Sequence, residues 1–442
     1  MSLLWTKQEL RALFGTGFDI TGISIDSRSI QPGELFVALI DQRDGHDFVE
    51  VAFAKGAAAA LVSKPLPGNT ILVPDTLHAL EQLGKTAVAR ARAQRIAITG
   101  SVGKTTTKEM LRRALSRFGS VHAAEASFNN HIGVPLTLAR MPQATDFAVF
   151  EIGMNHQGEI APLAGLVRPD IALITCIDRA HLGLMGSEEA IAREKSTLFA
   201  SLRAGGTAII PGESGFQPLL RAAVPAGATT LTTGEDAKLL EYEPTATGSH
   251  ILVNLASGNV RLTLDAPGEH MVRNAMAVLL ATQALGLNAP DAAAALDGFA
   301  PYKGRGARRP LDLPQGRVLL FDESYNASRA SLRAALAVLK LQPGRHVAVL
   351  GDMLELGEFA VDEHLALRPD VLASADVVFT AGVHMQHLFD SLPPSNQGAH
   401  APDSASLAPL VKSALRAGDT VLVKGSFGSR MRDVIQALES PG

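Results

Sequence analysis

A short glycine-rich segment, Gly100-Ser-Val-Gly-Lys-Thr-Thr106, constrains this chain more than any other feature. It follows the apolar run 96–99 and precedes a stretch whose apolar residues recur at helical spacing. Between a strand and a helix, glycines let backbone N–H groups turn toward phosphate oxygens, and the helix N-terminus adds a favourable dipole. In such a loop Lys104 would contact the β- and γ-phosphates, and the Thr105 hydroxyl would reach Mg²⁺. The sequence therefore predicts a nucleotide-binding domain built on a parallel sheet.

The loop departs from the common Walker A spacing, because Ile98 stands where the first glycine of that pattern belongs. A glycine-rich turn with a surface lysine is the alternative interpretation. The strand before the loop and the threonines within it favour a phosphate loop. The residues expected to bind the nucleotide here are Gly100, Ser101, Val102, Gly103, Lys104, Thr105 and Thr106.

Hydropathy patterns divide the chain into three α/β domains. Residues 1–92 hold short strand-like runs between turns and end in a helical pattern, which predicts a small N-terminal α/β domain. Residues 93–309 alternate strands with helices, as in a central parallel-sheet domain of the P-loop ATPase type. Residues 310–442 repeat that pattern as a Rossmann-like domain. A chain of 442 residues is long enough for this arrangement, and residues 304–309 are expected to form a linker.

Apolar runs give the expected strands, and helical spacing gives the clearest helices. The expected strands are residues 22–25, 33–39, 58–62, 70–73, 96–99, 147–152, 171–177, 207–210, 318–321, 347–350, 377–380 and 420–423. The expected helices are residues 78–92, 271–285 and 330–341.

Charge and cysteine content indicate the cellular setting. The formal net charge is −4 and no basic stripe occurs, so nucleic-acid binding has little electrostatic support. The single cysteine, Cys176, excludes an internal disulfide, and the first residues lack the apolar core of a signal peptide. No apolar run approaches the ~20 residues that a membrane helix needs. We expect a cytoplasmic monomer that is not inserted into a membrane.

Four further polar residues suit a nucleotide site. Glu151 ends a strand, where an acid can point into the ligand crevice and hold Mg²⁺, or can simply face solvent. His181 follows another strand and can bind metal or position phosphate, although an ordinary loop histidine is the simpler interpretation. Lys195 lies on a helix and by itself is typical of a solvated lysine. Asn274 begins a helix, and its amide either suits an adenine edge or is an ordinary polar residue there.

Polar clusters also follow three strands of the C-terminal domain: Asp322-Glu-Ser-Tyr-Asn-Ala327, Gly351-Asp-Met-Leu-Glu-Leu-Gly357 and Lys424-Gly-Ser426. Because the carboxyl ends of parallel strands meet at one edge of a sheet, these clusters are expected to build one rim of a site. In the N-terminal domain, Asp26-Ser-Arg28 and Asp44-Gly-His-Asp47 are by themselves simple polar turns.

These residues, in this order, closely resemble the Mur ligases of cell-wall synthesis, and the resemblance covers essentially the whole chain. Members of that family share a Thr-Gly-x-x-Gly-Lys-Thr loop, seen here from Thr99 to Thr105, which accounts for the departure from the Walker A spacing. They also share the strand-end glutamate, the loop histidine, the helix lysine and a Gly-x-His-x-x-x-Asn segment, which here are Glu151, His181, Lys195 and the segment from Gly268 to Asn274.

The resemblance implies a nucleotide and metal site. Lys195 would be carbamylated, and its carboxylate-like end would share Mg²⁺ with Thr105, Glu151 and His181. Asn274 would hold the adenine of ATP. Arg305 and Asp322 would close over the nucleotide from the C-terminal side. The catalytic residues implied are Lys104, Glu151, His181 and Lys195.

Within the family, the more specific motifs resemble those of members that join D-alanyl-D-alanine to UDP-N-acetylmuramoyl-tripeptide. The implied reaction forms an acyl phosphate and yields the UDP-N-acetylmuramoyl-pentapeptide precursor of peptidoglycan. The resemblance implies that the residues facing the UDP-linked substrate are Ser27, Arg28, Gly45, His46, Asn129 and Asn130. It implies that those receiving the dipeptide are Tyr325, Asn326, Asp352, Lys424 and Ser426.

One segment departs from the family pattern. Asn326-Ala-Ser-Arg329 stands where the family usually has Asn-Ala-Asn-Pro, which removes a proline-fixed helix start and adds a charge.

Three other functions are alternatives for this chain. A sister ligase with another acceptor is the nearest alternative, and the C-terminal clusters argue against it. A GTPase would need an Asn-Lys-x-Asp motif, which is absent from the sequence, and the phosphate loop argues against a nucleotide-sugar-binding protein without turnover.

Overall fold

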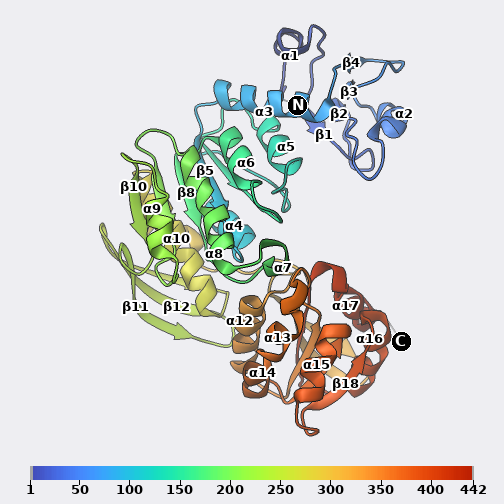
Figure 1. Cartoon of the computed structure of the whole chain (residues 1–442), viewed down its shortest axis with the longest axis vertical. Helices are drawn as coiled ribbons and strands as arrows, with labels where there is room; N and C mark the ends of the chain where they lie inside the picture. The colour runs from blue at the N-terminus through green and yellow to red at the C-terminus, as the bar shows by residue number, and fades with distance from the viewer. Residues whose placement is uncertain (1–2, 441–442) are drawn as a thin grey trace.

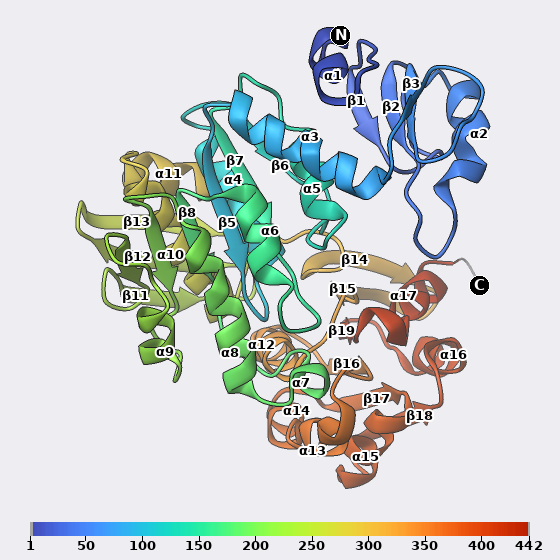
Figure 2. The same ribbon diagram turned by 45° about the horizontal axis from the view of Figure 1, so that its top comes forward.

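The computed structural model describes residues 3–440. It consists of three sheet-containing blocks, with the N-terminal block at one end, the C-terminal block at the other and the central block between them (Figure 1). Figure 2 shows the molecule from a second direction, with the central block on the left and the N-terminal and C-terminal blocks above and below one another on the right. The three-domain α/β architecture expected from the sequence is confirmed.

The N-terminal block is a four-stranded parallel sheet in the order β1-β2-β3-β4. Its elements are α1 (Lys7–Phe14), β1 (Gly22–Ser24), β2 (Glu34–Val37), α2 (Val49–Ala54), β3 (Ala59–Val62), β4 (Thr70–Leu72) and α3 (Thr76–Arg90). Asp75 caps α3 by accepting a hydrogen bond from His78 N at 2.8 Å. The buried Trp5 donates to Ala139 O at 2.9 Å, which ties this block to the central one.

The central block is built on a six-stranded parallel sheet in the order β10-β9-β8-β5-β7-β6. Its strands are largely buried apolar runs, as expected for a sheet covered on both faces. The strands are β5 (Gln94–Thr99), β6 (Val121–Ala123), β7 (Phe147–Glu151), β8 (Ile171–Ile174), β9 (Thr207–Ile210) and β10 (Thr229–Thr232). The helices are α4 (Lys104–Leu115), α5 (Gly133–Ala139), α6 (Ile160–Val167), α7 (Leu182–Met185), α8 (Glu188–Ser196), α9 (Gln217–Ala222), α10 (Glu269–Ala284) and α11 (Ala289–Leu296).

A second, antiparallel sheet in the central block was not predicted. It consists of β11 (Ala237–Pro244), β12 (Ser249–Leu255) and β13 (Gly258–Leu264). The expected strand 171–177 is also too long, because β8 ends at Ile174. Thr175 then turns toward the glycine-rich loop, where its hydroxyl donates to Val102 O at 2.5 Å.

The C-terminal block holds a six-stranded sheet in the order β14-β15-β19-β16-β17-β18, parallel except for the edge strand β14. Its strands are β14 (Ala307–Leu313), β15 (Gly316–Glu323), β16 (His346–Gly351), β17 (Val377–Ala381), β18 (Gln397–Ala401) and β19 (Thr420–Lys424). Its helices are α12 (Arg329–Lys340), α13 (Ala360–Leu365), α14 (Arg368–Ser374), α15 (Val383–Ser391), α16 (Ser404–Ala414) and α17 (Arg432–Glu439).

The structure bears on the expected linker between the central and C-terminal domains. The expected linker 304–309 is wrong in its second half, because β14 begins at Ala307 and pairs with β15. Pro310 fits this strand because an edge position tolerates a residue without an N–H. Division of the chain at residues 92 and 309 remains our proposal for the domain limits. Over residues 3–440, no helix combines the length and the apolar character that crossing a bilayer requires.

Candidate active site

The glycine-rich loop connects β5 to α4, as predicted, and two of its glycines are required by their surroundings. Gly100 has φ 149°, and a Cβ at this position would collide with Thr175 Oγ1. Gly103 has φ 86° and caps α4; a Cβ there would lie 2.8 Å from Asn274 Oδ1. Asn274, from α10, therefore lies beside the loop, with a side chain that is buried.

Lys104 and Thr105 are the first two residues of α4, directly after the loop. Lys104 Nζ donates to Gly100 O at 2.7 Å, and burial lowers the pKa of this amine. Ser101 Oγ donates to Asp178 O at 2.9 Å, which closes the loop on the segment after β8. The Lys104 amine and the first turn of α4 therefore lie at the same loop, and the N-terminus of a helix is a favourable position for an anion.

Glu151 lies at the carboxyl end of β7, next to β5, with a side chain that is buried. Its Oε2 accepts a hydrogen bond from Thr105 Oγ1 at 2.7 Å, and its Oε1 accepts one from Asn129 Nδ2 at 2.8 Å. Thr105 Oγ1 also lies 3.2 Å from Ser127 Oγ. A carboxylate and a hydroxyl beside the phosphate loop are the oxygen donors that Mg²⁺ prefers, so these residues fit that ion.

Lys195 lies on α8, the helix that Ser187 caps, and is 1% exposed. Burial, followed by the repulsion of Lys104, lowers the pKa of its amine to about 7. The solvated lysine that its sequence context suggested is therefore not what the structure contains. An amine with a pKa near 7 has a substantial uncharged fraction at neutral pH, and an uncharged amine can react as a nucleophile.

His181 follows β8 and begins α7. Its Nδ1 lies 2.5 Å from Oε2 of Glu355, in the loop after β16, and this contact lowers the pKa of the Glu355 carboxyl. Among residues 3–440, no group of three His, Cys, Asp or Glu side chains is close enough to form a metal site on its own. Thr105 and Glu151 are brought together, whereas the histidine is held by the C-terminal block.

Arg305 reaches from the segment before β14 into the same region. Its Nη2 donates to Ser127 Oγ at 2.9 Å, and its guanidinium lies 4.0 Å from the centre of the Tyr325 ring. Asp322 is buried, and its carboxylate accepts a hydrogen bond from Ser324 Oγ at 2.7 Å. Arg305 is thus near the phosphate loop, while Asp322 orders the turn after β15.

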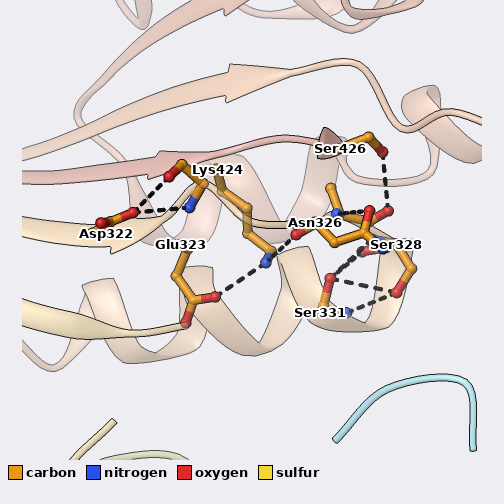
Figure 3. Close-up of polar contacts among 9 residues, drawn as sticks. Asp322, Glu323, Asn326, Ser328, Ser331, Lys424 and Ser426 are labelled. Carbon is orange, nitrogen blue, oxygen red and sulfur yellow. Dashed lines mark hydrogen bonds and ion pairs between the residues drawn. The ribbon is translucent and has the colours of Figure 1, made fainter. Parts of the chain in front are cut away.

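Lys424 lies at the centre of the polar cluster of the C-terminal block (Figure 3). Its side chain is buried, and its Nζ donates to Glu323 Oε2 at 3.2 Å and to Asn326 O at 2.9 Å. Ser426 accepts a hydrogen bond from Leu354 N at 3.0 Å. The ends of β15, β16 and β19 therefore meet at one rim, as their position in the sequence predicted.

The other residues expected to receive the dipeptide differ in how far their side chains are already hydrogen-bonded or exposed. Asp352 accepts a hydrogen bond from Met385 N at 2.7 Å, so its carboxylate caps the start of α15. The side chain of Asn326 accepts from Ala327 N at 2.8 Å. Tyr325 is 39% exposed and its ring centre lies 6.0 Å from that of Phe427. Tyr325 is therefore more available to a ligand than Asp352.

The departure at residues 328–329 has a structural explanation. Ser328 caps α12 in a reciprocal arrangement with Ser331, visible in Figure 3, and so replaces a proline-fixed start with a side-chain cap. Arg329 forms an ion pair with Glu363 at 3.3 Å. The added charge is compensated within the C-terminal block.

The N-terminal candidates lie in two turns of the first block. Arg28 is exposed and pairs with Asp26 at 2.7 Å, while Ser27 beside it is buried. His46 is buried, and its two ring nitrogens contact Asp44 Oδ1 at 2.5 Å and Ser63 N at 2.8 Å. Gly45 N donates to Leu39 O at 2.7 Å. The structure gives His46 and Gly45 a role in shaping the turn, and leaves Arg28 accessible.

Asn130 also shapes the chain locally, because its Oδ1 accepts a hydrogen bond from Gly133 N at 2.8 Å at the start of α5. Sequence reasoning missed three residues: Ser127, which contacts Thr105 and Arg305; Glu355, which contacts His181; and Lys108, whose buried amine donates to Ala124 O and Ala126 O. Ser127 opens the segment Ser127-Phe-Asn-Asn130, whose cluster of polar residues was a usable signal. The contact of Glu355 with His181 joins distant parts of the chain, and no pattern in the sequence predicts it.

Comparison with known proteins gives matches along the chain. The Mur ligase family catalytic domain matches residues 19–118, the Mur ligase middle domain matches residues 98–282, and the Mur ligase glutamate ligase domain matches residues 313–427. A UDP-N-acetylmuramoyl-tripeptide–D-alanyl-D-alanine ligase from Bacillus subtilis (strain 168) is 35% identical, covering 96% of this chain and 94% of that protein. The ligase of the same name from Escherichia coli (strain K12) is 34% identical and covers 96% of each chain.

Solved structures agree with the sequence relatives. A crystal structure of MurF from Acinetobacter baumannii superposes with a TM-score of 0.88 at 31% identity, covering 98% of both chains. The MurF ligase from Thermotoga maritima in complex with ADP has a TM-score of 0.80 at 25% identity, covering 95% of this chain and 97% of that one. The similarity therefore extends through all three blocks and the loop that carries Lys104. The chain belongs to the Mur ligase family.

Proposed function

We propose that this chain is the ATP-dependent ligase that joins D-alanyl-D-alanine to UDP-N-acetylmuramoyl-tripeptide, giving the UDP-linked pentapeptide precursor of peptidoglycan. One observation carries the proposal: ligases of that name match 96% of the chain at up to 35% identity. The site supports it, because Lys104, Thr105 and Glu151 converge at the carboxyl ends of β5 and β7. That edge of a parallel sheet is where ligands bind in such folds.

In the first step, a carboxylate oxygen of the tripeptide attacks the γ-phosphorus of ATP, the bond to the β–γ bridging oxygen breaks, and ADP leaves. The product is an acyl phosphate. Lys104 and the N–H groups that begin α4 stabilise the negative charge on the transferred phosphoryl group. Arg305, held against Ser127 at 2.9 Å, adds a second cation on the C-terminal side.

In the second step, the amine of D-alanyl-D-alanine attacks the acyl carbon. The amide C–N bond forms, the C–O bond to phosphate breaks, and inorganic phosphate leaves while the amine loses a proton. The acyl phosphate must be protected from water, which the contacts of Arg305 and His181 with the C-terminal block support.

Bound Mg²⁺ would neutralise charge on the phosphates, with Thr105, Glu151, His181 and a carbamylated Lys195 as its ligands. In carbamylation, the uncharged Lys195 amine forms a bond to the carbon of CO₂ and releases a proton. The burial of this amine and its pKa of about 7 support the modification, because they favour the uncharged amine.

The remaining substrate contacts are proposed by region. Ser27, Arg28, Gly45 and His46 would form the turns offered to the UDP end, and Asn129 and Asn130 would face the UDP-linked substrate near the phosphate loop. Tyr325, Asn326, Asp352, Lys424 and Ser426 form the acceptor rim, with Asn274 and Asp322 on the nucleotide side. We further propose that the ligase acts as a monomer in the cytoplasm.

The test is product analysis. The protein is incubated with ATP, Mg²⁺ and UDP-N-acetylmuramoyl-tripeptide, and the acceptor is either D-alanyl-D-alanine or a single amino acid. A UDP-pentapeptide in the mass spectrum that requires ATP and the dipeptide supports the proposal. Product formation only with a single amino acid and a shorter UDP-peptide would reassign the chain to a sister ligase.

A further inference from the structure

A chain of hydrogen bonds connects the C-terminal side of the candidate site to Glu151. Arg305 Nη2 donates to Ser127 Oγ at 2.9 Å, and Ser127 Oγ lies 3.2 Å from Thr105 Oγ1. Thr105 Oγ1 in turn donates to Glu151 Oε2 at 2.7 Å. Of these four residues, which we call the donor chain, Ser127 is the one that is neither charged nor part of the phosphate loop.

The number of available protons fixes the direction of these hydrogen bonds. A guanidinium has only donors, whereas a hydroxyl has one proton and two acceptor lone pairs. Because the Thr105 proton is given to Glu151, the 3.2 Å contact must be a donation from Ser127 to Thr105. Ser127 has its proton available, because Arg305 engages only a lone pair of its oxygen. Donation therefore runs in one direction, from the cation through two hydroxyls to the carboxylate, and such an arrangement strengthens each bond.

Arg305 is fixed to the C-terminal block by its neighbours. Gly306 N donates to Asp322 O at 2.9 Å, and Gly304 O accepts a hydrogen bond from Tyr325 N at 3.1 Å. The Arg305 guanidinium also lies 4.0 Å from the centre of the Tyr325 ring. The position of Arg305 relative to the phosphate loop therefore depends on how the C-terminal block is docked.

Ser127 is held by the central block. Lys108, on α4, donates to Ala126 O at 3.1 Å, directly before the serine. Two residues after the serine, Asn129 O accepts a hydrogen bond from Gly153 N at 2.8 Å, just beyond the end of β7. The contact between Ser127 and Arg305 is therefore the point at which the donor chain crosses from one block to the other.

We propose that Ser127 is a positioning residue that connects docking of the C-terminal domain to the Mg²⁺ site through the Thr105 hydroxyl. With its proton given to Glu151 and one lone pair engaged by Ser127, Thr105 Oγ1 has a single lone pair left for a ligand. The two hydrogen bonds fix the direction of that lone pair, as outer-shell partners orient metal ligands. That nucleotide and Mg²⁺ bind beside Thr105 rests on the proposed function, whereas the hydrogen bonds do not.

The first test measures how much Mg²⁺ strengthens nucleotide binding. Full-length protein is titrated calorimetrically with β,γ-imido-ATP, once with Mg²⁺ and once with EDTA, and the ratio of the two dissociation constants is compared between variants. Ser127→Ala is expected to reduce this ratio at least roughly tenfold, and Ser127→Thr, which keeps a hydroxyl, to retain most of it. Glu125→Gln, at an exposed position of the same segment, is the matched control and should leave the ratio unchanged.

A double-mutant cycle then tests the connection to the C-terminal block. A direct contact of Arg305 with phosphate would affect both titrations, so the ratio isolates the contribution of the metal. Arg305→Ala should reduce the ratio, but in a Ser127→Ala background it should reduce it no further, because its influence passes through the serine hydroxyl.

Three results would overturn the proposal: additive losses in the double variant, an unchanged ratio in folded Ser127→Ala protein, or a wild-type ratio near one. Failure of the proposed function gives a different result. If the variants show the expected pattern of ratios but the wild-type protein forms no UDP-pentapeptide, the proposed function fails and the role of Ser127 stands.

Discussion

Thr105 Oγ1 donates a hydrogen bond to Glu151 Oε2 at 2.7 Å, joining the first turn of α4 to the last residue of β7. Asn129 Nδ2 binds the other carboxylate oxygen at 2.8 Å. Both oxygens of a buried carboxylate are thereby oriented beside the phosphate loop. Preorganised oxygen ligands of this kind are what an Mg²⁺ site for phosphoryl transfer requires.

Replacing Glu151 with Gln is expected to weaken Mg²⁺ binding. The amide keeps the size of the side chain, but it removes the negative charge and puts an NH₂ group opposite either Thr105 or Asn129. The Mg²⁺ concentration for half-maximal phosphate release should rise at least roughly tenfold. Glu50→Gln, at an exposed position of α2, is the control and should leave the titration unchanged. An unaltered Mg²⁺ requirement in Glu151→Gln would remove Glu151 from the metal site.

Lys104→Ala should reduce turnover by at least about 10²-fold, because the cation closest to the transferred phosphoryl group is lost. Phosphate release under saturating ATP measures the effect. Lys340→Ala, at the exposed end of α12, is the matched control. Near-wild-type turnover in Lys104→Ala would contradict the assignment of the nucleotide site.

Gly100→Ala is expected to damage both stability and ATP binding. The new Cβ would collide with Thr175 Oγ1, whereas a Cβ on Gly205, which also has positive φ at 73°, meets nothing within 4 Å. Gly205→Ala should therefore lose only about 1–2 kcal/mol of unfolding free energy from backbone strain. Urea unfolding and calorimetric ATP titration compare the two variants. Equal stability losses and equal ATP affinities would show that the loop is less tightly packed than the structure indicates.

Lys195→Ala should be nearly inactive, and a short carboxylate added to the buffer should restore part of the activity. The added carboxylate can occupy the space left by the proposed carbamate and supply its oxygens to the metal. Phosphate release is measured as the carboxylate concentration increases, with chloride at equal ionic strength as the control. If no carboxylate restores activity, the carbamate loses its main support.

Lys108→Met is expected to affect the nucleotide-peptide substrate through the segment 124–130. The buried Lys108 amine donates to Ala124 O at 2.6 Å and to Ala126 O at 3.1 Å, just before Ser127 and Asn129. Leaving these carbonyls without a donor should cost about 1–3 kcal/mol of stability. The KM for the UDP-tripeptide should rise more than the KM for the dipeptide. Equal changes in both KM values would contradict a role specific to this segment.

The sequence predicted the parts of the fold that follow from local pattern. Buried parallel strands such as β9 and β17 are short apolar runs, and they were located within a residue or two. The β11–β13 sheet was missed because β11 is largely exposed and has no sustained apolar run, and the apolar run of β12, residues 251–253, is short. The start of β14 was missed because Ala307-Arg-Arg309 has no apolar run, and its pairing with β15 depends on the tertiary fold.

The site residues likewise fall into those that local sequence predicts and those that depend on tertiary contacts. The phosphate loop and Glu151 could be predicted because a strand followed by a turn fixes where their side chains lie. Lys195 could not be distinguished from a solvated lysine, since its burial depends on distant elements. The turn role of His46 and the capping role of Asp352 likewise follow from partners that only the folded chain brings near them.

The most direct test of the ligase mechanism follows an oxygen atom. The terminal carboxylate of the UDP-tripeptide is labelled with ¹⁸O, and the phosphate released in the presence of ATP and D-alanyl-D-alanine is examined by mass spectrometry. An acyl phosphate intermediate predicts one ¹⁸O atom in the phosphate for each amide bond formed, because the carboxylate oxygen leaves with phosphorus. Release of unlabelled phosphate together with pentapeptide would contradict activation of the carboxylate by phosphoryl transfer.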